Sequence, residues 1–219
     1  MIIRRKNEHR SWRTDVALVL MGVCFFVLAA LVLFHVTDSL DRAFLSALEG
    51  IRSGSLTEVV KVVTDFAGLY ASVGILAAVG VSFAFSKQYD KAVILACIAL
   101  AATLIGLAIK VAVARNRPDV AMALMSETGS SFPSRHAVTS SAIGFGIIAL
   151  LWSTKWRLVA LLASVLYVVG IGFTRLYLAV HFPTDIIGAW LLSGVVVIAA
   201  MYILGYYNVR KQAKAMEDK

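Results

Sequence analysis

The chain has 219 residues, of which 60% are hydrophobic and 16% charged, and its mean hydropathy is +0.83. This composition is too apolar for a water-soluble domain and predicts an integral membrane protein. A net charge of +8 is compatible with nucleic-acid binding, but the Lys and Arg residues lie mainly in short segments between apolar runs, which argues against that partner. The two cysteines, Cys24 and Cys97, lie inside apolar runs and predict no disulfide framework.

Six apolar runs follow one another along the chain, each flanked by charges or turn formers: residues 16–34, 66–85, 92–113, 137–152, 158–180 and 186–206. A helix needs about 20 such residues to cross the hydrocarbon core. The first run is longer than a signal-peptide core and has no small-x-small cleavage site after it, so we expect an uncleaved helix. The fourth run is short, and its assignment requires Ser134, Arg135 and His136 to be helical too. The sequence thus predicts an all-α integral membrane protein, with six transmembrane helices forming a single domain over residues 1–219.

The distribution of positive charge predicts the orientation of these helices. Thirteen of the 21 Lys and Arg residues fall on the side that carries both termini, so we expect cytoplasmic termini in a bacterial or archaeal plasma membrane. Eight fall on the outer side. Five of those eight gather near the ends of the third, fourth and fifth helices, where they require a functional explanation: Lys110, Arg115, Arg117, Arg135 and Arg175.

The first outer loop contains an amphipathic stretch, residues 38–55. Apolar residues recur there at helical spacing, and Gly54 is expected to close the helix. This pattern predicts a short interfacial helix on the outer membrane surface. An ordinary solvated loop is the alternative.

Lys110 and Arg117 are seven residues apart, so a continuing third helix would place them on one face, where both can point at one anion. For Lys110, snorkelling to the interface is the alternative. Ser134 is a natural N-cap of the fourth helix, and the free N–H groups and dipole of such a helix end attract phosphate. His136 lies in the first turn, where it could hold or release a proton. A capped helix with a purely structural histidine is the alternative there.

Arg175, His181 and Asp185 surround one short loop between the fifth and sixth helices. An Asp four residues after a His can accept the imidazole N–H and leave the other ring nitrogen as a nucleophile. The competing interpretation is a structural ion pair between Arg175 and Asp185.

Together the three segments resemble the signature of the type 2 phosphatidic acid phosphatase superfamily, which reads KxxxxxxRP, PSGH and SRxxxxxHxxxD in that order. The match covers residues 110–185 and preserves the spacing within each segment. Thr174 replaces the usual Ser and keeps its hydroxyl. Arg135 replaces the usual Gly, and its side chain either adds a cation beside the phosphate or points outward.

The resemblance implies a membrane lipid phosphatase that acts through a phosphohistidine. His181, oriented by Asp185, would attack phosphorus, and His136 would protonate the leaving oxygen and then activate water. The phosphoryl oxygens would be held by Lys110, Arg117, Ser134, Arg135 and Arg175. No metal or other cofactor is expected, because these cations offset the phosphoryl charge.

The resemblance implies a lipid phosphate as partner and substrate: phosphatidylglycerol phosphate, phosphatidic acid, diacylglycerol pyrophosphate or undecaprenyl pyrophosphate. A lipid phosphotransferase is the alternative within enzymes. A transporter or channel is the alternative outside them, but the charges gather at one face and do not cross the bilayer.

Overall fold

The structure, a computed structural model, describes the backbone of residues 3–119 and 122–217, and within them the side chains of residues 12, 14–119 and 122–205. The terminal Lys and Arg residues that support the predicted orientation lie outside the described side chains. The described backbone contains no strand, which confirms the all-α prediction. Its eight helices are α1 (Ile3–Leu33), α2 (Asp38–Glu49), α3 (Gly54–Asp65), α4 (Leu69–Phe85), α5 (Tyr89–Val113), α6 (Arg135–Leu151), α7 (Arg157–Tyr177) and α8 (Pro183–Glu217).

Four helices are long and apolar enough to span a membrane: Thr14–Leu33 within α1, α5, α7, and Pro183–Gly205 within α8. Helices α3 and α4 meet at 55° across a short break, and as one broken span they raise the number to five. Helix α6 is apolar but has only 17 residues, about 26 Å at 1.5 Å per residue, against a hydrocarbon core of about 30 Å. The described residues therefore give four or five candidate spans, and the sixth stays a prediction.

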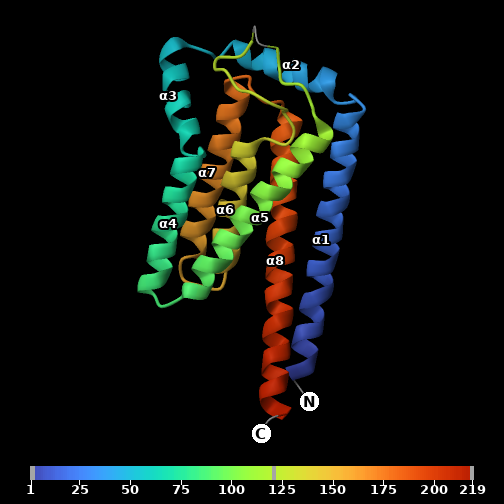
Figure 1. Ribbon diagram of the computed structural model, residues 1–219, viewed down its shortest axis with the longest axis vertical. Helices are drawn as coiled ribbons and strands as arrows, with labels where there is room; N and C mark the ends of the chain where they lie inside the picture. The colour runs from blue at the N-terminus through green and yellow to red at the C-terminus, as the bar shows by residue number, and fades with distance from the viewer. Residues whose placement is uncertain (1–2, 120–121, 218–219) are drawn as a thin grey trace.

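The predicted amphipathic stretch is divided differently in the structure. Helix α2 ends at Glu49, and Gly54 begins α3 with Ser53 as the N-cap, so the expectation that Gly54 closes the first helix was wrong. Ser53 accepts a hydrogen bond from the Leu56 N–H at 3.4 Å, which explains why a helix starts here. Helix α2 lies across the end of the bundle, opposite the end where α1 begins and α8 ends (Figure 1). Its place on a membrane surface stays a prediction.

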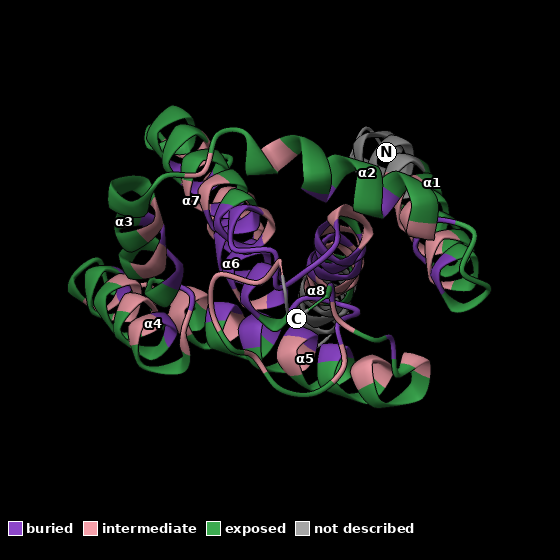
Figure 2. Cartoon of the chain, turned by 90° about the horizontal axis from the view of Figure 1, so that it is seen from above, coloured by how far each residue is buried: buried purple, intermediate pink, exposed green. Residues whose placement is uncertain are grey.

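Helix α6 lies in the centre of the bundle and packs against α5, α7 and α8. Most of its residues are buried, whereas the outer faces of the surrounding helices are exposed (Figure 2). Gly144 permits the close approach of α7, since a Cβ there would lie 2.7 Å from the Val168 side chain. The N-terminal end of α6 is thereby held in the middle of the bundle, beneath the long α5–α6 connection.

The start of α8 is fastened to the segment that precedes α6. Phe132 is fully buried against Gly188, where a Cβ would lie 2.5 Å from the aromatic ring. The Ser134 N–H donates to the backbone carbonyl of Asp185 at 3.2 Å. This packing brings the PSRH segment, residues 133–136, next to the first turn of α8.

Candidate active site

The structure brings the predicted site residues to one end of the bundle, below α2. Lys110 lies in the last turn of α5, Arg175 in the last turn of α7, and His181 in the link between α7 and α8. The remaining predicted residues lie in the α5–α6 connection or at the starts of α6 and α8: Arg117, Ser134, Arg135, His136 and Asp185.

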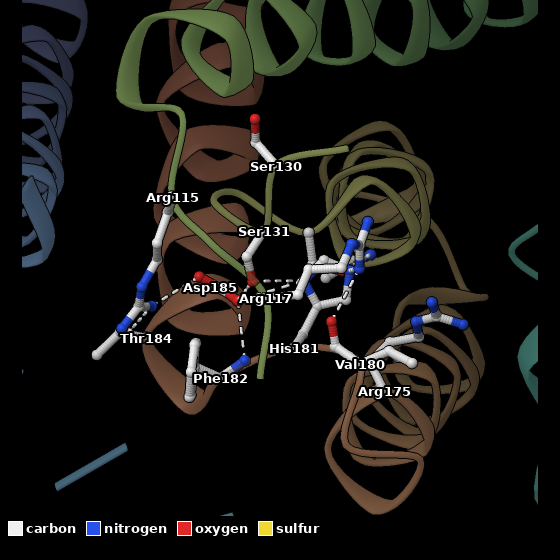
Figure 3. Close-up of polar contacts among 12 residues, drawn as sticks. Arg115, Arg117, Ser130, Ser131, Arg175, Val180, His181, Phe182, Thr184 and Asp185 are labelled. Carbon is white, nitrogen blue, oxygen red and sulfur yellow. Dashed lines mark hydrogen bonds and ion pairs between the residues drawn. The ribbon is translucent and has the colours of Figure 1, made fainter. Parts of the chain in front are cut away.

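His181 is held between an acceptor and a donor (Figure 3). Its Nδ1 lies 3.3 Å from Asp185 Oδ2, and its Nε2 lies 3.2 Å from NH1 of Arg117. Arginine has no acceptor atom, so Nε2 accepts from Arg117 and the Nδ1–H donates to Asp185. The imidazole is buried, and this burial lowers the pKa of His181 to about 4 although the Asp185 carboxylate acts in the opposite direction. At neutral pH the ring is neutral, with its lone pair on Nε2.

Both carboxylate oxygens of Asp185 are occupied. Besides His181, Oδ2 accepts from the Phe182 N–H at 2.8 Å and from the hydroxyl of Ser131. Oδ1 accepts from NH1 of Arg115 at 2.8 Å. These donors compensate a fully buried carboxylate and fix the plane in which it faces His181.

Lys110 and Arg117 do not share the face of a continuing helix. Helix α5 ends at Val113, and Ala114 adopts a left-handed conformation with φ 49°, so the chain turns before it reaches Arg117. The Lys110 ammonium instead donates to the carbonyls of Ser130 and Ser131, at 2.5 and 3.2 Å. The conditional prediction of a shared helix face was wrong, although both cations still lie at the same end of the bundle.

Arg117 is held by the backbone of two loops. Its guanidinium donates to three carbonyl oxygens, those of Thr128, Gly129 and Val180, at 3.1, 3.0 and 2.8 Å. These bonds aim NH1 at His181, while NH2 lies 3.6 Å from Oε2 of Glu127. Burial lowers the pKa of Arg117 from its ordinary value.

Arg175 is fully buried and pairs with Glu127, a residue for which the sequence suggested no role. Its NH1 also donates to the Thr64 hydroxyl at 3.0 Å. The alternative ion pair with Asp185 does not form. Burial alone would raise the pKa of Glu127, but the guanidinium of Arg175, with help from Arg117, holds it below its ordinary value.

The start of α6 has the predicted cap. The Ser134 hydroxyl accepts from the Ala137 N–H at 3.5 Å, and the Ser134 side chain is fully buried. His136 is buried, and its imidazole has no hydrogen bond to any described residue. The Arg135 side chain is exposed, likewise without a hydrogen bond to the described part of the chain.

Beside these residues an apolar groove of about 450 Å³ opens between α4, α5 and α6. Lys110, Pro133 and Arg135 lie at its polar end, and the rest of its wall is mainly apolar, reaching back along α5 to Ala96. Lys110 and Ala96 are 14 positions apart in α5, so the groove follows this helix for about 21 Å.

Sequence reasoning missed four residues of this constellation. Asp41 had a usable signal, because it lies four residues before the buried Leu45 on one face of the amphipathic α2. Arg115 was noted among the outer cations but received no role. Ser131 and Glu127 lie in an irregular loop, where spacing predicts no direction for a side chain.

Among the described residues, no group of three or more His, Cys, Asp or Glu side chains is arranged to hold a metal ion, and metal independence stays a prediction.

Known proteins resemble this chain in both sequence and fold. The model of the PAP2 superfamily matches residues 91–209, more than half of the chain. Phosphatidylglycerophosphatase B of Bacillus subtilis is 27% identical over 176 residues, which cover 77% of this chain and 85% of that protein. The crystal structure of a transmembrane PAP2-type phosphatidylglycerolphosphate phosphatase from Bacillus subtilis matches with a TM-score of 0.76 and 25% identity, over 86% of this chain and 96% of that one. Aquifex aeolicus LpxE matches with a TM-score of 0.62 and 20% identity, over 74% and 94% respectively, which is a likeness of fold.

Proposed function

Because the chain belongs to the PAP2 superfamily, we propose that it is a membrane phosphatase that hydrolyses a lipid phosphate through a phosphohistidine on His181. The observation that carries this proposal is the apolar groove whose polar end is formed by Lys110 and Arg135, two of the predicted phosphate ligands. Its length of about 21 Å suits a long acyl or prenyl chain, and its polar end suits a phosphate. One substrate with a charged head and an apolar tail satisfies both features.

Phosphatidylglycerol phosphate is the first substrate to test, since the curated relative is a phosphatidylglycerophosphatase. Phosphatidic acid, diacylglycerol pyrophosphate and undecaprenyl pyrophosphate share the same pairing of head and tail and complete the panel. The predicted set of phosphate ligands remains Lys110, Arg117, Ser134, Arg135 and Arg175.

In the proposed reaction, Nε2 of His181 attacks phosphorus, the bond from phosphorus to the lipid oxygen breaks, and an N–P bond forms. His136 donates its proton to the departing lipid alcohol. Water then attacks the phosphohistidine while His136 takes one of its protons, and the N–P bond breaks to release inorganic phosphate. The Nε2 lone pair favoured by Asp185 and Arg117 supports the first step.

The residues that would offset the phosphoryl charge are all cationic side chains or N–H groups of this chain. Arg117 and Arg175 bring two guanidinium groups to the loop around His181, and the start of α6 adds free N–H groups. We therefore propose a phosphatase that needs no metal or other cofactor. Full activity in excess EDTA is the expected result, and strict dependence on added magnesium would contradict it.

We place the site on the outer face of a bacterial or archaeal plasma membrane, with cytoplasmic termini, α2 at the interface and α6 as the sixth span. The location of the site at the end of the bundle opposite the start of α1 supports this arrangement. The whole chain then forms one transmembrane phosphatase domain. Labelling of single cysteines at exposed Ser55 and exposed Tyr89, at opposite ends of the bundle, with an impermeant maleimide tests the orientation.

The test of function is phosphate release from the lipid panel by purified protein in detergent. We expect His181→Asn to abolish release and the matched control His35→Asn, at an exposed histidine in a turn, to retain it. Label transferred from the lipid phosphate to a second lipid instead of water would indicate a phosphotransferase. Absence of turnover on every substrate by the wild type would refute the proposal.

A further inference from the structure

Arg115 is a buried cation on the far side of Asp185 from His181 (Figure 3). Its side chain is 3% exposed. NH1 donates to Asp185 Oδ1 and to the Thr184 hydroxyl, each at 2.8 Å, and NH2 donates to Asp41 Oδ2 at 2.7 Å. The guanidinium also lies 4.2 Å from the centre of the Phe182 ring. It therefore contacts two consecutive residues of the first turn of α8 and the residue before that helix.

Asp41 connects this cation to α2. Its Oδ1 accepts from the Thr184 N–H at 3.1 Å, and its Oδ2 accepts from the Thr184 hydroxyl at 2.6 Å. Asp38, one turn earlier in α2, lies 3.2 Å from NH2 of Arg115. Helix α2 is thus attached to the first turn of α8 both directly and through Arg115.

The two buried carboxylates depend on the guanidinium between them. Asp41 and Asp185 are 2% and 0% exposed, and without a cation two buried like charges would repel each other strongly. Oδ2 of Asp185 serves His181, Ser131 and a backbone N–H, whereas Oδ1 accepts from Arg115 alone among the described residues. Arg115 therefore holds the Oδ1 side of the carboxylate, and together with the Phe182 N–H and the Ser131 hydroxyl on Oδ2 it fixes the rotation about the Cβ–Cγ bond and the aim of the bond to Nδ1 of His181.

We propose that Arg115, held by Asp41 of α2, is a positioning residue that orients Asp185 and through it the nucleophile His181. The inference rests on the proposed function. It gives α2 an indirect part in the reaction, through Arg115 and Asp185, although α2 carries none of the motif residues. Arg115 itself does not contact the phosphate in this proposal, because NH1 and NH2 already bond Asp185, Thr184 and Asp41. Its Nε is buried and has no hydrogen-bond partner among the described residues.

Steady-state kinetics of Arg115→Gln and Asp41→Asn test this role. We expect kcat to fall about 100-fold in Arg115→Gln, the scale of a misplaced reacting group, with little change in KM. Arg115→Lys should have a higher kcat than Arg115→Gln but a lower one than the wild type. Lysine keeps the positive charge but lacks the two terminal nitrogens with which the guanidinium bonds both carboxylates. The matched control is Arg42→Gln, an exposed arginine of α2 that pairs with Asp38, for which we expect unchanged kinetics.

A second readout separates positioning from general damage to the fold. Without Arg115 the negative charge of Asp185 acts more strongly on His181, so the acid limb of the kcat/KM profile should move to higher pH. Loss of the buried cation also lowers stability, so rates are normalised to the folded fraction, and Asp41→Asn is the milder variant. Unchanged kcat in folded Arg115→Gln, or a rise in KM alone, would overturn the inference. An inactive wild type would instead refute the proposed function.

A separate observation concerns the carboxylate of Glu127. It lies between two guanidinium groups that the proposed function assigns to phosphate, paired with Arg175 through Oε1 and 3.6 Å from NH2 of Arg117 through Oε2. Glu127 belongs to the α5–α6 connection and is only partly buried, so it can leave these partners more readily than a helix residue. A carboxylate flanked by two arginines presents them with an arrangement of oxygens similar to that of a phosphate.

We infer that Glu127 occupies the phosphate position of the ligand-free site and competes with the substrate for Arg117 and Arg175. Inorganic orthophosphate, as product, and vanadate are the probes. Because Glu127→Gln removes the competing charge, we expect the inhibition constant of orthophosphate to fall by about tenfold. Glu58→Gln, at an exposed acid paired with Lys61, is the control that should leave it unchanged.

The sign of this effect decides the role of Glu127. If the carboxylate instead serves to hold the arginines in place, its removal weakens phosphate binding and the inhibition constant rises. A constant that rises or stays the same therefore overturns the inference, and Glu127→Asp, which shortens the reach, provides a second variant with an expected intermediate decrease. Failure of orthophosphate and vanadate to inhibit the wild type would count against the phosphate site itself.

Discussion

Arg117 donates a hydrogen bond from NH1 to Nε2 of His181 over 3.2 Å. This contact identifies Nε2 as the ring nitrogen that carries the lone pair and accepts the hydrogen bond, because a guanidinium can only donate. It also places a cation directly at the atom that would carry the phosphoryl group. When phosphate enters, the same guanidinium is positioned to turn its donor to a phosphoryl oxygen.

Replacement of Arg117 by Lys tests this double use. Lysine keeps the charge but cannot bond three backbone carbonyls and still direct a donor at His181. We expect kcat/KM to fall by about 10²-fold or more in Arg117→Lys, the range for loss of one donor that stabilises a transition state. Arg42→Lys serves as the exposed control. Activity within threefold of wild type would exclude a direct part for Arg117.

The pH profile depends on His181, which faces Asp185, Ser131 and Arg117, with Arg175 at longer range. Burial lowers its pKa to about 4, so the imidazole stays neutral and nucleophilic well below the ordinary value of about 6.5. We expect the acid limb of kcat/KM to lie near pH 4. A limb centred near 6.5, measured after brief exposure to each pH, would contradict this burial.

The same shift affects stability, and its sign follows from linkage. Between pH 6.5 and 4 the unfolded chain binds a proton at His181 that the folded chain does not. The contribution of His181 to stability is therefore fully present above about pH 6.5 and is lost as the pH falls toward 4. His181→Asn should flatten this part of a plot of unfolding midpoint against pH.

Arg135 extends the positive charge toward the mouth of the apolar groove without a hydrogen-bond partner in the described residues. We therefore expect Arg135→Gly, which restores the family residue, to raise KM about threefold with kcat nearly unchanged, and the effect to shrink at high salt. Arg135→Lys should keep the wild-type KM. A loss of kcat by two orders of magnitude would contradict this and show that Arg135 stabilises the transition state in addition to its proposed part in binding the ground-state phosphate.

Gly188 sets how closely α8 approaches the segment before α6. A Cβ there would lie 2.5 Å from Cε2 of Phe132, so Gly188→Ala should cost about 1–3 kcal/mol of stability by overpacking. The unfolding midpoint in detergent measures this. Gly170→Ala in α7, where a Cβ meets nothing within 4 Å, is the control and should be neutral or slightly stabilising. Equal midpoints for the two variants would contradict the packing described here.

Much of this fold follows from local sequence patterns. Apolar runs predict helices because burial and backbone hydrogen bonding act over short segments, and Ser134 and Pro183 begin α6 and α8 as their residue types favour. The break between α3 and α4 was not predicted, since the strong signal of the apolar run at 66–85 hides the helix before it.

The sequence predicts those contacts of the site that lie within one motif, where the spacing between residues is short. The spacing of four residues between His181 and Asp185 is enough to predict their hydrogen bond. The ion pair between Arg115 and Asp41 joins residues 74 positions apart, and no local pattern predicts it. The left-handed turn at Ala114 redirects the chain between Lys110 and Arg117, and no helical period anticipates it. Contacts that depend on irregular loops or on distant helices require the packed structure.

The most direct test of the account is to trap the phosphoenzyme. Phosphatidylglycerol phosphate carrying a labelled terminal phosphate is mixed with the wild type and with His136→Ala, quenched in base and mapped by proteolysis. We predict label on His181 in the wild type and none in His181→Asn. Because His136 acts in both steps, His136→Ala should gain the label more slowly and, once labelled, lose it more slowly. Sustained phosphate release by His181→Asn, or label on another residue, would contradict the account.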